Sequence, residues 1–241
     1  MKTLALIPHY KHETMVAQVV AGVRAFGLDV LIVDDGSGEP SGAVLRDLAE
    51  QEGVFVLFRP VNGGKGAAMK AGLKWAVQQG YSHVLQVDAD GQHELNDISK
   101  MLLLAQENPE AVVCGAPQYG DDAPKARVYG RKITDFWNAL HTGSRDIRDG
   151  MCGFRLYPAV CTFAVICEEN IGNRMDFDTE ILIHLYWRRV PLVWLDTPVR
   201  YAADGISHFR SWQDNVLISK MHARLFCQML ARRWRNKGRV R

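Results

Sequence analysis

Short apolar runs alternate with amphipathic stretches along the first half of the chain. Four runs have the length and composition of buried strands, at residues 4–7, 30–33, 54–58 and 84–87. Apolar positions recur at helical spacing in residues 14–26 and 41–52, and from the loop at 62–66 to about residue 79. Because proline lacks an amide hydrogen, Pro8 predicts the end of the first strand. Regular alternation of strand and helix predicts an open, mostly parallel sheet with helical crossovers.

Acidic side chains follow two of these predicted strands. Asp34 and Asp35 come after the second strand, and Asp88 and Asp90 come after the fourth. Ligands of such sheets bind at the carboxyl ends of the strands, so we expect the four carboxylates to converge on one crevice. Carboxylate oxygens suit Mg²⁺ or Mn²⁺, which bind through one or two carboxylates plus substrate phosphates. The pattern predicts a metal and a nucleotide diphosphate there, although a single Asp-x-Asp is also typical of a solvated strand end.

Two other nucleotide-binding motifs fit the chain less well. Residues 62–66, Asn-Gly-Gly-Lys-Gly, lack the spacing and the Lys-Ser/Thr ending of a phosphate loop. The first strand ends in Pro8, His9 and Tyr10 instead of the glycine triplet of a dinucleotide-binding fold. An NTPase or a dehydrogenase is therefore disfavoured. The glycines of residues 62–66 indicate either a tight loop that opens a helix or a direct contact with phosphate.

Six ordered segments carry a family resemblance, namely residues 7–10 with Glu13, 33–37, 62–66, 87–92, 150–155 and 177–182. In their order and spacing, residues 2–207 resemble the family-2 inverting glycosyltransferases, in the polyprenyl-phosphate branch that includes dolichyl-phosphate mannose synthases. The resemblance implies an α/β protein of GT-A (nucleotide-diphospho-sugar transferase) fold, with a mostly parallel central sheet flanked by helices. It also implies metal-dependent transfer of a sugar from a nucleotide-diphosphate sugar to a lipid-linked acceptor, with inversion at the anomeric carbon.

The resemblance further implies roles for individual residues. The nucleotide-binding candidates are Pro8, Tyr10, Glu13, Asp35, Lys65 and Asp88. The metal candidates are Asp88, Asp90 and Gln92. Asp178 and Asp90 are the catalytic candidates. If the acceptor is a hydroxyl, Asp178 on the acceptor side removes its proton, whereas a phosphate acceptor needs no base and Asp178 positions it.

The acceptor-binding candidates are Arg131, Arg155, Ser207 and His208. The chain departs from the family pattern in two places. Lys11 and His12 separate Glu13 from the tyrosine that usually precedes an Asn-Glu pair, and this leaves the role of Glu13 open. Ala202 and His208 stand where polyprenyl-phosphate enzymes often carry Arg and Lys. Two expected phosphate contacts are therefore missing or weakened, and both a phosphate and another hydrophobic acceptor remain open.

The charge distribution changes near residue 214. After Asp214 there is no acid but eight bases, at Lys220, Arg224, Arg232, Arg233, Arg235, Lys237, Arg239 and Arg241, although the whole chain carries only +2. Apolar residues recur at helical spacing over residues 216–230, which predicts an amphipathic helix that either covers the sheet or lies on an anionic membrane. We predict a glycosyltransferase domain at 1–214 and a basic helix and tail at 215–241. Nucleic acid is a weaker candidate partner, because the body is acidic and carries no known nucleic-acid motif.

Composition limits the compartment and the alternatives. Five cysteines without Cys-x-x-Cys spacing predict neither a zinc site nor a disulfide framework. The apolar start is too short for a signal peptide and no run has the length of a membrane helix, so we expect a cytoplasmic protein, peripheral on the inner face of the membrane. A non-catalytic nucleotide-sugar-binding protein and a nucleotidyltransferase remain alternatives. The latter usually carries a glycine-rich, arginine-bearing loop after its first strand, which this chain lacks.

Overall fold

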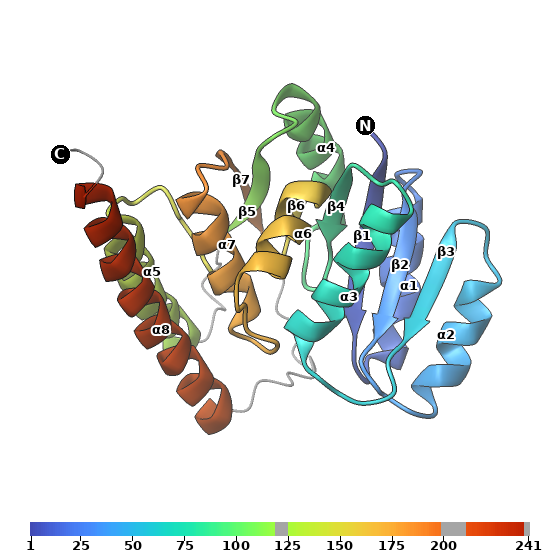
Figure 1. The fold of residues 1–241 in the computed structure, drawn as a ribbon. Coiled ribbons are helices and arrows are strands. Elements are labelled where there is room, and N and C mark those ends of the chain that lie inside the picture. Colours follow the sequence, from blue (N-terminus) through green and yellow to red (C-terminus); the bar gives the residue numbers. More distant parts are fainter. Residues whose placement is uncertain (119–124, 199–210, 239–241) are drawn as a thin grey trace.

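A seven-stranded sheet forms the centre of the protein (Figure 1). The structure is a computed structural model that describes residues 1–118, 125–198 and 211–238. The strands are β1 Thr3–His9, β2 Asp29–Asp34, β3 Val54–Phe58, β4 His83–Gln86, β5 Val112–Gln118, β6 Arg155–Pro158 and β7 Leu192–Pro198. Their order across the sheet is β3-β2-β1-β4-β6-β5-β7. Strand β6 is antiparallel to β4 and β5, whereas the other pairs are parallel, which confirms the mostly parallel sheet.

Helices cover both faces of this sheet. The described helices are α1 Glu13–Arg24, α2 Ser41–Ala49, α3 Lys65–Gln78, η1 Leu95–Asp97, α4 Ile98–Glu107, α5 Lys125–Thr142, α6 Ala159–Glu168, α7 Phe177–Trp187 and α8 Ser211–Gly238. Alternate side chains of β1 point to opposite faces, as expected for a strand. Leu4 and Leu6 pack with residues of α3, α6 and α7, whereas Ala5 and Ile7 pack with residues of α1, α2 and α4. Two apolar cores therefore hold the sheet between two helical layers.

Strand β1 continues through Pro8, contrary to the expectation that the strand ends there. The β1–β4 pairing reaches only as far as Leu6 opposite Gln86, while the β1–β2 pairing continues through Pro8 to His9. The amide of Asp35 donates to the carbonyl of His9, so Pro8, one position earlier, faces the β4 side, where no ladder remains. Because the β1–β4 ladder has already ended there, the missing amide hydrogen of Pro8 removes no ladder hydrogen bond.

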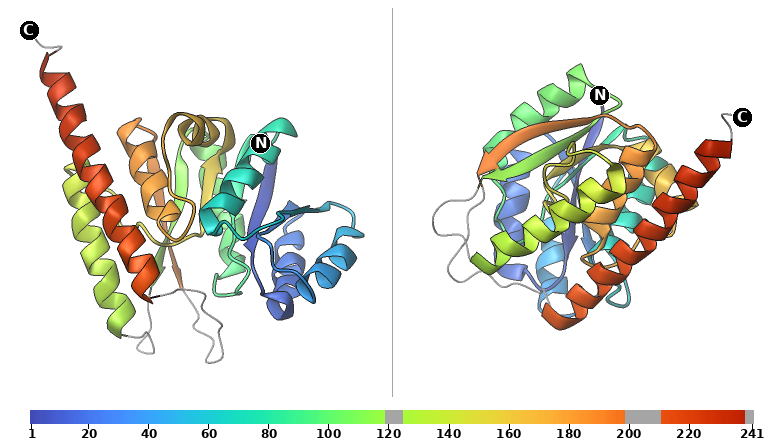
Figure 2. Two further views of the ribbon diagram at one scale, coloured as in Figure 1. Left: turned by 60° about the horizontal axis from the view of Figure 1, so that its bottom comes forward. Right: turned by 90° about the vertical axis from the view of Figure 1, so that its left-hand side faces the viewer.

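Helices α5 and α8 lie side by side at one end of the molecule, beyond α7 (Figure 2). Helix α8 begins at Ser211, before the predicted boundary at residue 215, and it contributes Met221 and Leu225 to the core on the α7 side of the sheet. Of the apolar positions that recur at helical spacing in α8, Phe226 and Leu230 are 37% and 46% exposed. Among the described helices, none has the length and apolar character needed to cross a bilayer.

Two arginines of α8 bind acids of the body. Arg224 makes a bidentate contact with the fully buried Glu180 of α7, at 2.8 and 2.7 Å. Arg232 donates to Glu169 at 2.9 Å and lies over the ring of Trp187. These contacts use two of the eight bases predicted to form a cationic tail. The first part of α8 is therefore packed against the body, as the structural alternative for this helix predicts.

Candidate active site

One lysine joins two carboxylates at the carboxyl end of β4. Lys65 is the first residue of α3, Asp178 lies in the first turn of α7, and Asp88 follows β4. The Lys65 Nζ atom lies 2.8 Å from Asp88 Oδ1 and 2.8 Å from Asp178 Oδ2. We call these three residues the Lys65 cluster. It brings a predicted nucleotide and metal residue, Asp88, to the same cation as the predicted acceptor-side residue, Asp178.

The Lys65 cluster is largely shielded from water. The side chains of Lys65, Asp88 and Asp178 are 15%, 25% and 6% exposed. Burial by itself lowers the pKa of Lys65, but the carboxylates of Asp178 and Asp88 together outweigh burial and raise that pKa. Burial raises the pKa of Asp88, but Lys65 and His93 outweigh it and hold that pKa well below its usual range. Lys65 and Asp88 are therefore both charged at neutral pH.

His93 and Gly153 border the Lys65 cluster. The Nε2 atom of His93 lies 3.4 Å from Asp88 Oδ2, and its ring stacks on Phe154 at a centroid distance of 4.9 Å. A Cβ atom on Gly153 would lie 2.6 Å from Lys65 Nζ and 2.9 Å from Asp88 Oδ2. The position therefore requires glycine for close approach, which explains one glycine of the 150–155 segment. His93 was missed as a site residue, because a lone histidine beside an Asp-x-Asp pair has no ligand spacing of its own.

The acids that follow β2 do not join this cluster. Asp34 Oδ1 lies 3.0 Å from His9 Nδ1, and Asp34 Oδ2 accepts from the amide of Ser37 at 3.1 Å. Asp35 is 2% exposed, and its carboxylate is engaged in other internal contacts. Across the described residues, no group of three or more His, Cys, Asp or Glu side chains is arranged to hold a metal. The four carboxylates therefore do not form one metal-holding group, while the approach of Asp34 and Asp35 to the same nucleotide crevice stays a prediction.

Asp35 holds the loop at residues 62–66 in place. Its Oδ2 accepts from the amides of Gly63 and Gly64 at 3.1 and 2.6 Å, and its Oδ1 is bound by Arg59. Gly64 has a φ of 98°, and a Cβ atom there would lie 2.6 Å from the carbonyl oxygen of Asn173. The loop is thus tight and opens α3, as one of its two interpretations predicts. Contact of the loop with phosphate, and of Asp35 with a nucleotide, stay predictions.

The turn after β4 suits a divalent metal. Asp88 Oδ1 is buried and makes no hydrogen bond, although it lies close to Lys65 Nζ. Asp90 Oδ1 accepts from the amide of Gln92 at 3.1 Å, which closes the turn. Mg²⁺ and Mn²⁺ need only one or two carboxylates when a diphosphate supplies further oxygens. Asp88 and Asp90 fit that requirement. A role of the Gln92 side chain in metal binding stays a prediction.

The other nucleotide candidates lie at the ends of β1 and α1. Pro8 and Tyr10 are half-buried at the carboxyl end of β1. Glu13 is the first residue of α1 and accepts from Ser41 Oγ at 2.8 Å, which links the starts of α1 and α2. All three stand near the carboxyl edge of the sheet. Their contact with a base or ribose stays a prediction.

The arginines predicted to bind the acceptor have internal partners. Arg155 is fully buried, and its guanidinium donates to the backbone oxygen of Asp178. Arg155 therefore holds the backbone of Asp178 in place. Because its side chain is fully buried, the prediction that it contacts the acceptor is wrong. Arg131 pairs with Asp149, whose Oδ1 accepts from the amides of Met151 and Cys152 at 2.7 Å each. Ser207 and His208 lie outside the described residues.

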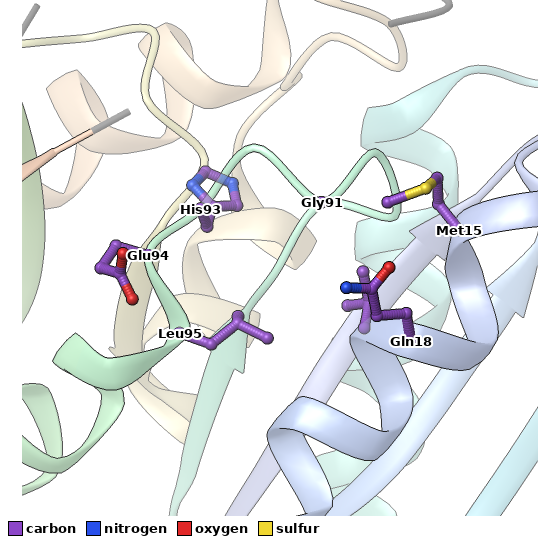
Figure 3. A pocket seen from close by; sticks show the side chains of 7 residues that line it. Met15, Gln18, Gly91, His93, Glu94 and Leu95 are labelled. Atoms are coloured by element: carbon purple, nitrogen blue, oxygen red, sulfur yellow. The ribbon is translucent and has the colours of Figure 1, made fainter. Parts of the chain in front are cut away.

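A small pocket opens beside the turn that carries Asp90 (Figure 3). Met15 and Gln18 of α1 lie on one side of it, and His93 and Glu94 lie on the other. The remaining lining residues are Val19, Gly91 and Leu95. None of the predicted nucleotide or metal residues lines this pocket. It therefore borders the candidate site through His93 and does not contain it.

Comparisons with known proteins identify the family of this chain. Residues 5–169 match the family described as Glycosyl transferase family 2. A dolichyl-phosphate beta-glucosyltransferase of Trichomonas vaginalis is 32% identical over 66% of this chain and 50% of its own length. The polyprenol monophosphomannose synthase of Mycolicibacterium smegmatis is 35% identical over 42% of this chain and 40% of its own length. The chain thus spans about half the length of these curated relatives, or less.

Solved structures show the same fold. Glucosyl-3-phosphoglycerate synthase from Mycobacterium tuberculosis, in complex with Mn²⁺, uridine diphosphate and phosphoglyceric acid, superposes with a TM-score of 0.68. The superposition covers 95% of this chain and 78% of that chain at 14% identity, a level that supports the fold alone. The predicted GT-A architecture is thereby confirmed. Together with the match over residues 5–169, these findings show that the chain belongs to glycosyl transferase family 2.

Proposed function

We propose that the protein is a metal-dependent inverting glycosyltransferase that moves a sugar from a nucleotide-diphosphate sugar to a lipid-linked acceptor, a polyprenyl phosphate or another hydrophobic molecule. The observation that carries the proposal is the Lys65 cluster, in which Asp88 on the donor side and Asp178 on the acceptor side share one cation. Relatives named for dolichyl-phosphate and polyprenol substrates support the acceptor class. A fold neighbour in complex with Mn²⁺ and uridine diphosphate supports a divalent metal and a nucleotide donor.

The proposed reaction is a single displacement. The acceptor oxygen bonds to the anomeric carbon on the face opposite the diphosphate, and the bond from that carbon to the diphosphate breaks. Asp88 and Asp90, with Gln92, would hold the metal, which supplies charge stabilisation for the leaving diphosphate. Asp178 takes the proton of a hydroxyl acceptor, or positions an acceptor that is already an anion. Lys65 lies between the two halves of the site and balances the charge of both carboxylates.

The product separates this proposal from the two alternatives. The protein is incubated with nucleotide sugars, Mn²⁺ and a polyprenyl phosphate, with a long-chain alcohol as a second acceptor. A glycosyltransferase releases nucleoside diphosphate from the nucleotide sugar, and a binding protein releases nothing. A nucleotidyltransferase releases pyrophosphate in a parallel incubation with nucleoside triphosphate and sugar 1-phosphate. Donors are first screened by thermal shift, since a ligand at a hundred times its dissociation constant stabilises the fold by about 2.7 kcal/mol. Release of pyrophosphate, or stabilisation by a donor without transfer to either acceptor, would contradict the proposal.

Replacing Asp90 with Asn tests the metal site. We expect Asp90→Asn to keep the fold, because the Asn oxygen still accepts from the Gln92 amide, while metal-dependent donor binding weakens and most turnover is lost. Donor affinity is measured with and without Mn²⁺, and turnover by nucleoside diphosphate release. Glu94→Gln, which removes a negative charge four residues further along, serves as the matched control. Full activity of Asp90→Asn would remove Asp90 from the metal site.

We also propose that the enzyme is cytoplasmic and peripheral, with α8 facing an anionic membrane on the inner face. Phe226, Leu230 and Trp234 follow each other every four residues along α8 and are 37%, 46% and 84% exposed. Residues four apart lie on one side of a helix, so these side chains form an apolar stripe. Arg233, beside this stripe, is exposed as well. Exposed apolar residues flanked by bases are typical of helices that lie on anionic lipid.

Removing residues 234–241 tests this proposal without disturbing the Arg224 and Arg232 contacts with the body. We expect the truncated protein to bind anionic liposomes more weakly and to keep its hydrolysis of the donor in solution. Binding of the full chain should fall above about 0.15 M salt, where the screening length is about 8 Å. A full-length variant with Gln at positions 235, 237, 239 and 241 separates the charges from Trp234. Equal co-sedimentation of all three proteins at low salt would contradict the membrane proposal.

A further inference from the structure

A line of buried polar side chains leads from strand β6 to Asp178. Arg155 Nη1 lies 3.5 Å from the hydroxyl of Tyr157, which donates to Gln86 Oε1 at 3.3 Å. Gln86 Nε2 then donates to Asp178 Oδ1 at 2.9 Å. We call Arg155, Tyr157 and Gln86 the Arg155 chain. All three side chains are fully buried, and they come from β4 and β6, which pair with Gln86 opposite Arg155.

The chemistry of these groups fixes the direction of the Arg155 chain. A guanidinium can only donate and a carboxylate can only accept. The hydroxyl of Tyr157 therefore accepts from Arg155 and offers its own hydrogen to Gln86, whose amide is left to donate to Asp178. Burial raises the pKa of Tyr157, so its hydroxyl keeps that hydrogen at neutral pH. A reversed Gln86 amide would set a donor against the Tyr157 hydrogen and an acceptor against the carboxylate.

Asp178 is held from two sides as a result. Gln86 binds Oδ1 at 2.9 Å, while Lys65 lies 2.8 Å from Oδ2. Arg155 also donates to the backbone oxygen of Asp178, and its Nη2 reaches the backbone oxygen of Asp149 at 3.4 Å. The backbone and both carboxylate oxygens of Asp178 thus have fixed partners. Rigid support of this kind matters because a displacement of 1 Å at a reacting group costs up to about 10²-fold in rate.

We propose that Gln86, Tyr157 and Arg155 are positioning residues that aim the carboxylate of Asp178 at the acceptor. This inference rests on the proposed function, in which Asp178 acts on the acceptor side. Within the described part of the molecule, the hydrogen bonds of the Arg155 chain lead to Asp178 and to the backbone oxygen of Asp149, and none of them reaches Asp88 or Asp90. Its loss should therefore change the turnover number and leave the handling of donor and metal unchanged.

A double-mutant cycle tests this inference. Gln86→Met keeps the length of the side chain but removes the hydrogen bond to Asp178, so we expect kcat to fall about tenfold or more. The KM for the donor and the dependence on Mn²⁺ should stay near those of the wild type. In an Asp178→Asn background, Gln86→Met should lower kcat little further, because the two changes remove one interaction. Tyr157→Phe, which deletes a single oxygen atom, provides a milder variant with a smaller loss in the same direction.

Thr179→Val is the structural control. Thr179 is buried beside Asp178, but its hydroxyl donates to Gly150 and takes no part in the Arg155 chain. It should lower the melting temperature without the loss of kcat. Equal losses from Gln86→Met in both backgrounds, or an unchanged kcat in both Gln86→Met and Tyr157→Phe, would overturn the inference while the wild type still transfers sugar. A wild-type protein that transfers no sugar to any acceptor would instead overturn the proposed function, and this inference with it.

Discussion

Asp178→Asn is expected to lower transfer to a hydroxyl acceptor by roughly 10²-fold or more. Asparagine has the size of aspartate but cannot take a proton, and it places an amide group or an uncharged oxygen against Lys65 where a carboxylate stood. Donor binding should stay near that of the wild type, because Asp88 and Asp90 are unchanged. The rate of nucleoside diphosphate release with each acceptor, together with donor affinity by thermal shift, measures both effects.

The matched control for this variant is Asp176→Asn. Asp176 is buried two residues before Asp178 and accepts from the amide of Arg174, outside the Lys65 cluster. The Asp176→Asn variant measures how far the loss of a buried carboxylate near the start of α7 lowers the stability of the fold, without a change in the Lys65 cluster. A much smaller loss with a polyprenyl phosphate than with an alcohol would identify a reaction that needs no base. A collapse of donor affinity in Asp178→Asn would place Asp178 on the donor side and contradict the assignment.

Arg224→Met is expected to destabilise the folded protein by about 3 kcal/mol. Glu180 is fully buried, and Arg224 of α8 holds it with a bidentate contact at 2.8 and 2.7 Å. Removing the guanidinium leaves a buried carboxylate that keeps the hydrogen bond from the amide of Gly172, at 2.7 Å, but has lost its cation. The value stands at the low end for a buried pair because Arg224 is 33% exposed. Denaturant unfolding of the wild type and the variant measures the difference.

The loss in Arg224→Met should depend on pH. Burial raises the pKa of Glu180, and hydrogen bonds from Arg224 and Gly172 lower it again only in part. A carboxyl whose pKa is higher in the folded state than in the unfolded state loses stability as pH rises between the two values. Without Arg224 the folded-state pKa rises further, so the deficit should be larger at about pH 7 than at about pH 4, near the unfolded value.

Arg233→Met is the control for the Arg224 variant, because Arg233 is exposed on the same helix. Its effect should stay within about 0.5 kcal/mol at both pH values. Equal destabilisation by Arg224→Met at pH 4 and pH 7 would show that its contribution is packing and not charge. Such a result would also show that Arg224 of α8 does not stabilise the charge of Glu180 in α7.

The local pattern of the sequence was sufficient for the elements that depend on local signals. Strand β3 has the predicted bounds, 54–58, and α2 begins at the predicted residue 41, because both follow from residues close together in the chain. The expected burial of this strand was wrong, since β3 lies at the edge of the sheet and Phe55 and Phe58 are 38% and 45% exposed. The six ordered segments led to the GT-A fold, which the comparisons confirm. The predicted end of β1 at Pro8 was wrong. A strand can continue through a proline where the neighbouring strand has already ended, and the end of β4 is not encoded by the residues near Pro8.

The partners of charged side chains could not be predicted in the same way. The sequence identified Asp34, Asp35, Asp88 and Asp178 as candidates, but whether a carboxylate faces a crevice or a neighbouring loop depends on segments far away along the chain. Asp35 binds the loop at 62–66, and Arg155, which was predicted to bind the acceptor, is fully buried and donates to the backbone oxygen of Asp178. Gln86 and Tyr157 carried no motif at all, because their role follows from the pairing of β4 with β6.

The sequence by itself thus determined the order of strands and helices as far as β4, the acidic turn after β4 and the basic, amphipathic character of α8, since each depends on residues close together in the chain. Only the tertiary structure decided that Lys65 joins Asp88 to Asp178 and that Arg224 binds Glu180. The physical reason is that an ion pair requires atoms within about 4 Å. Residues 113 positions apart, such as Lys65 and Asp178, reach that distance only when the sheet brings the starts of α3 and α7 together.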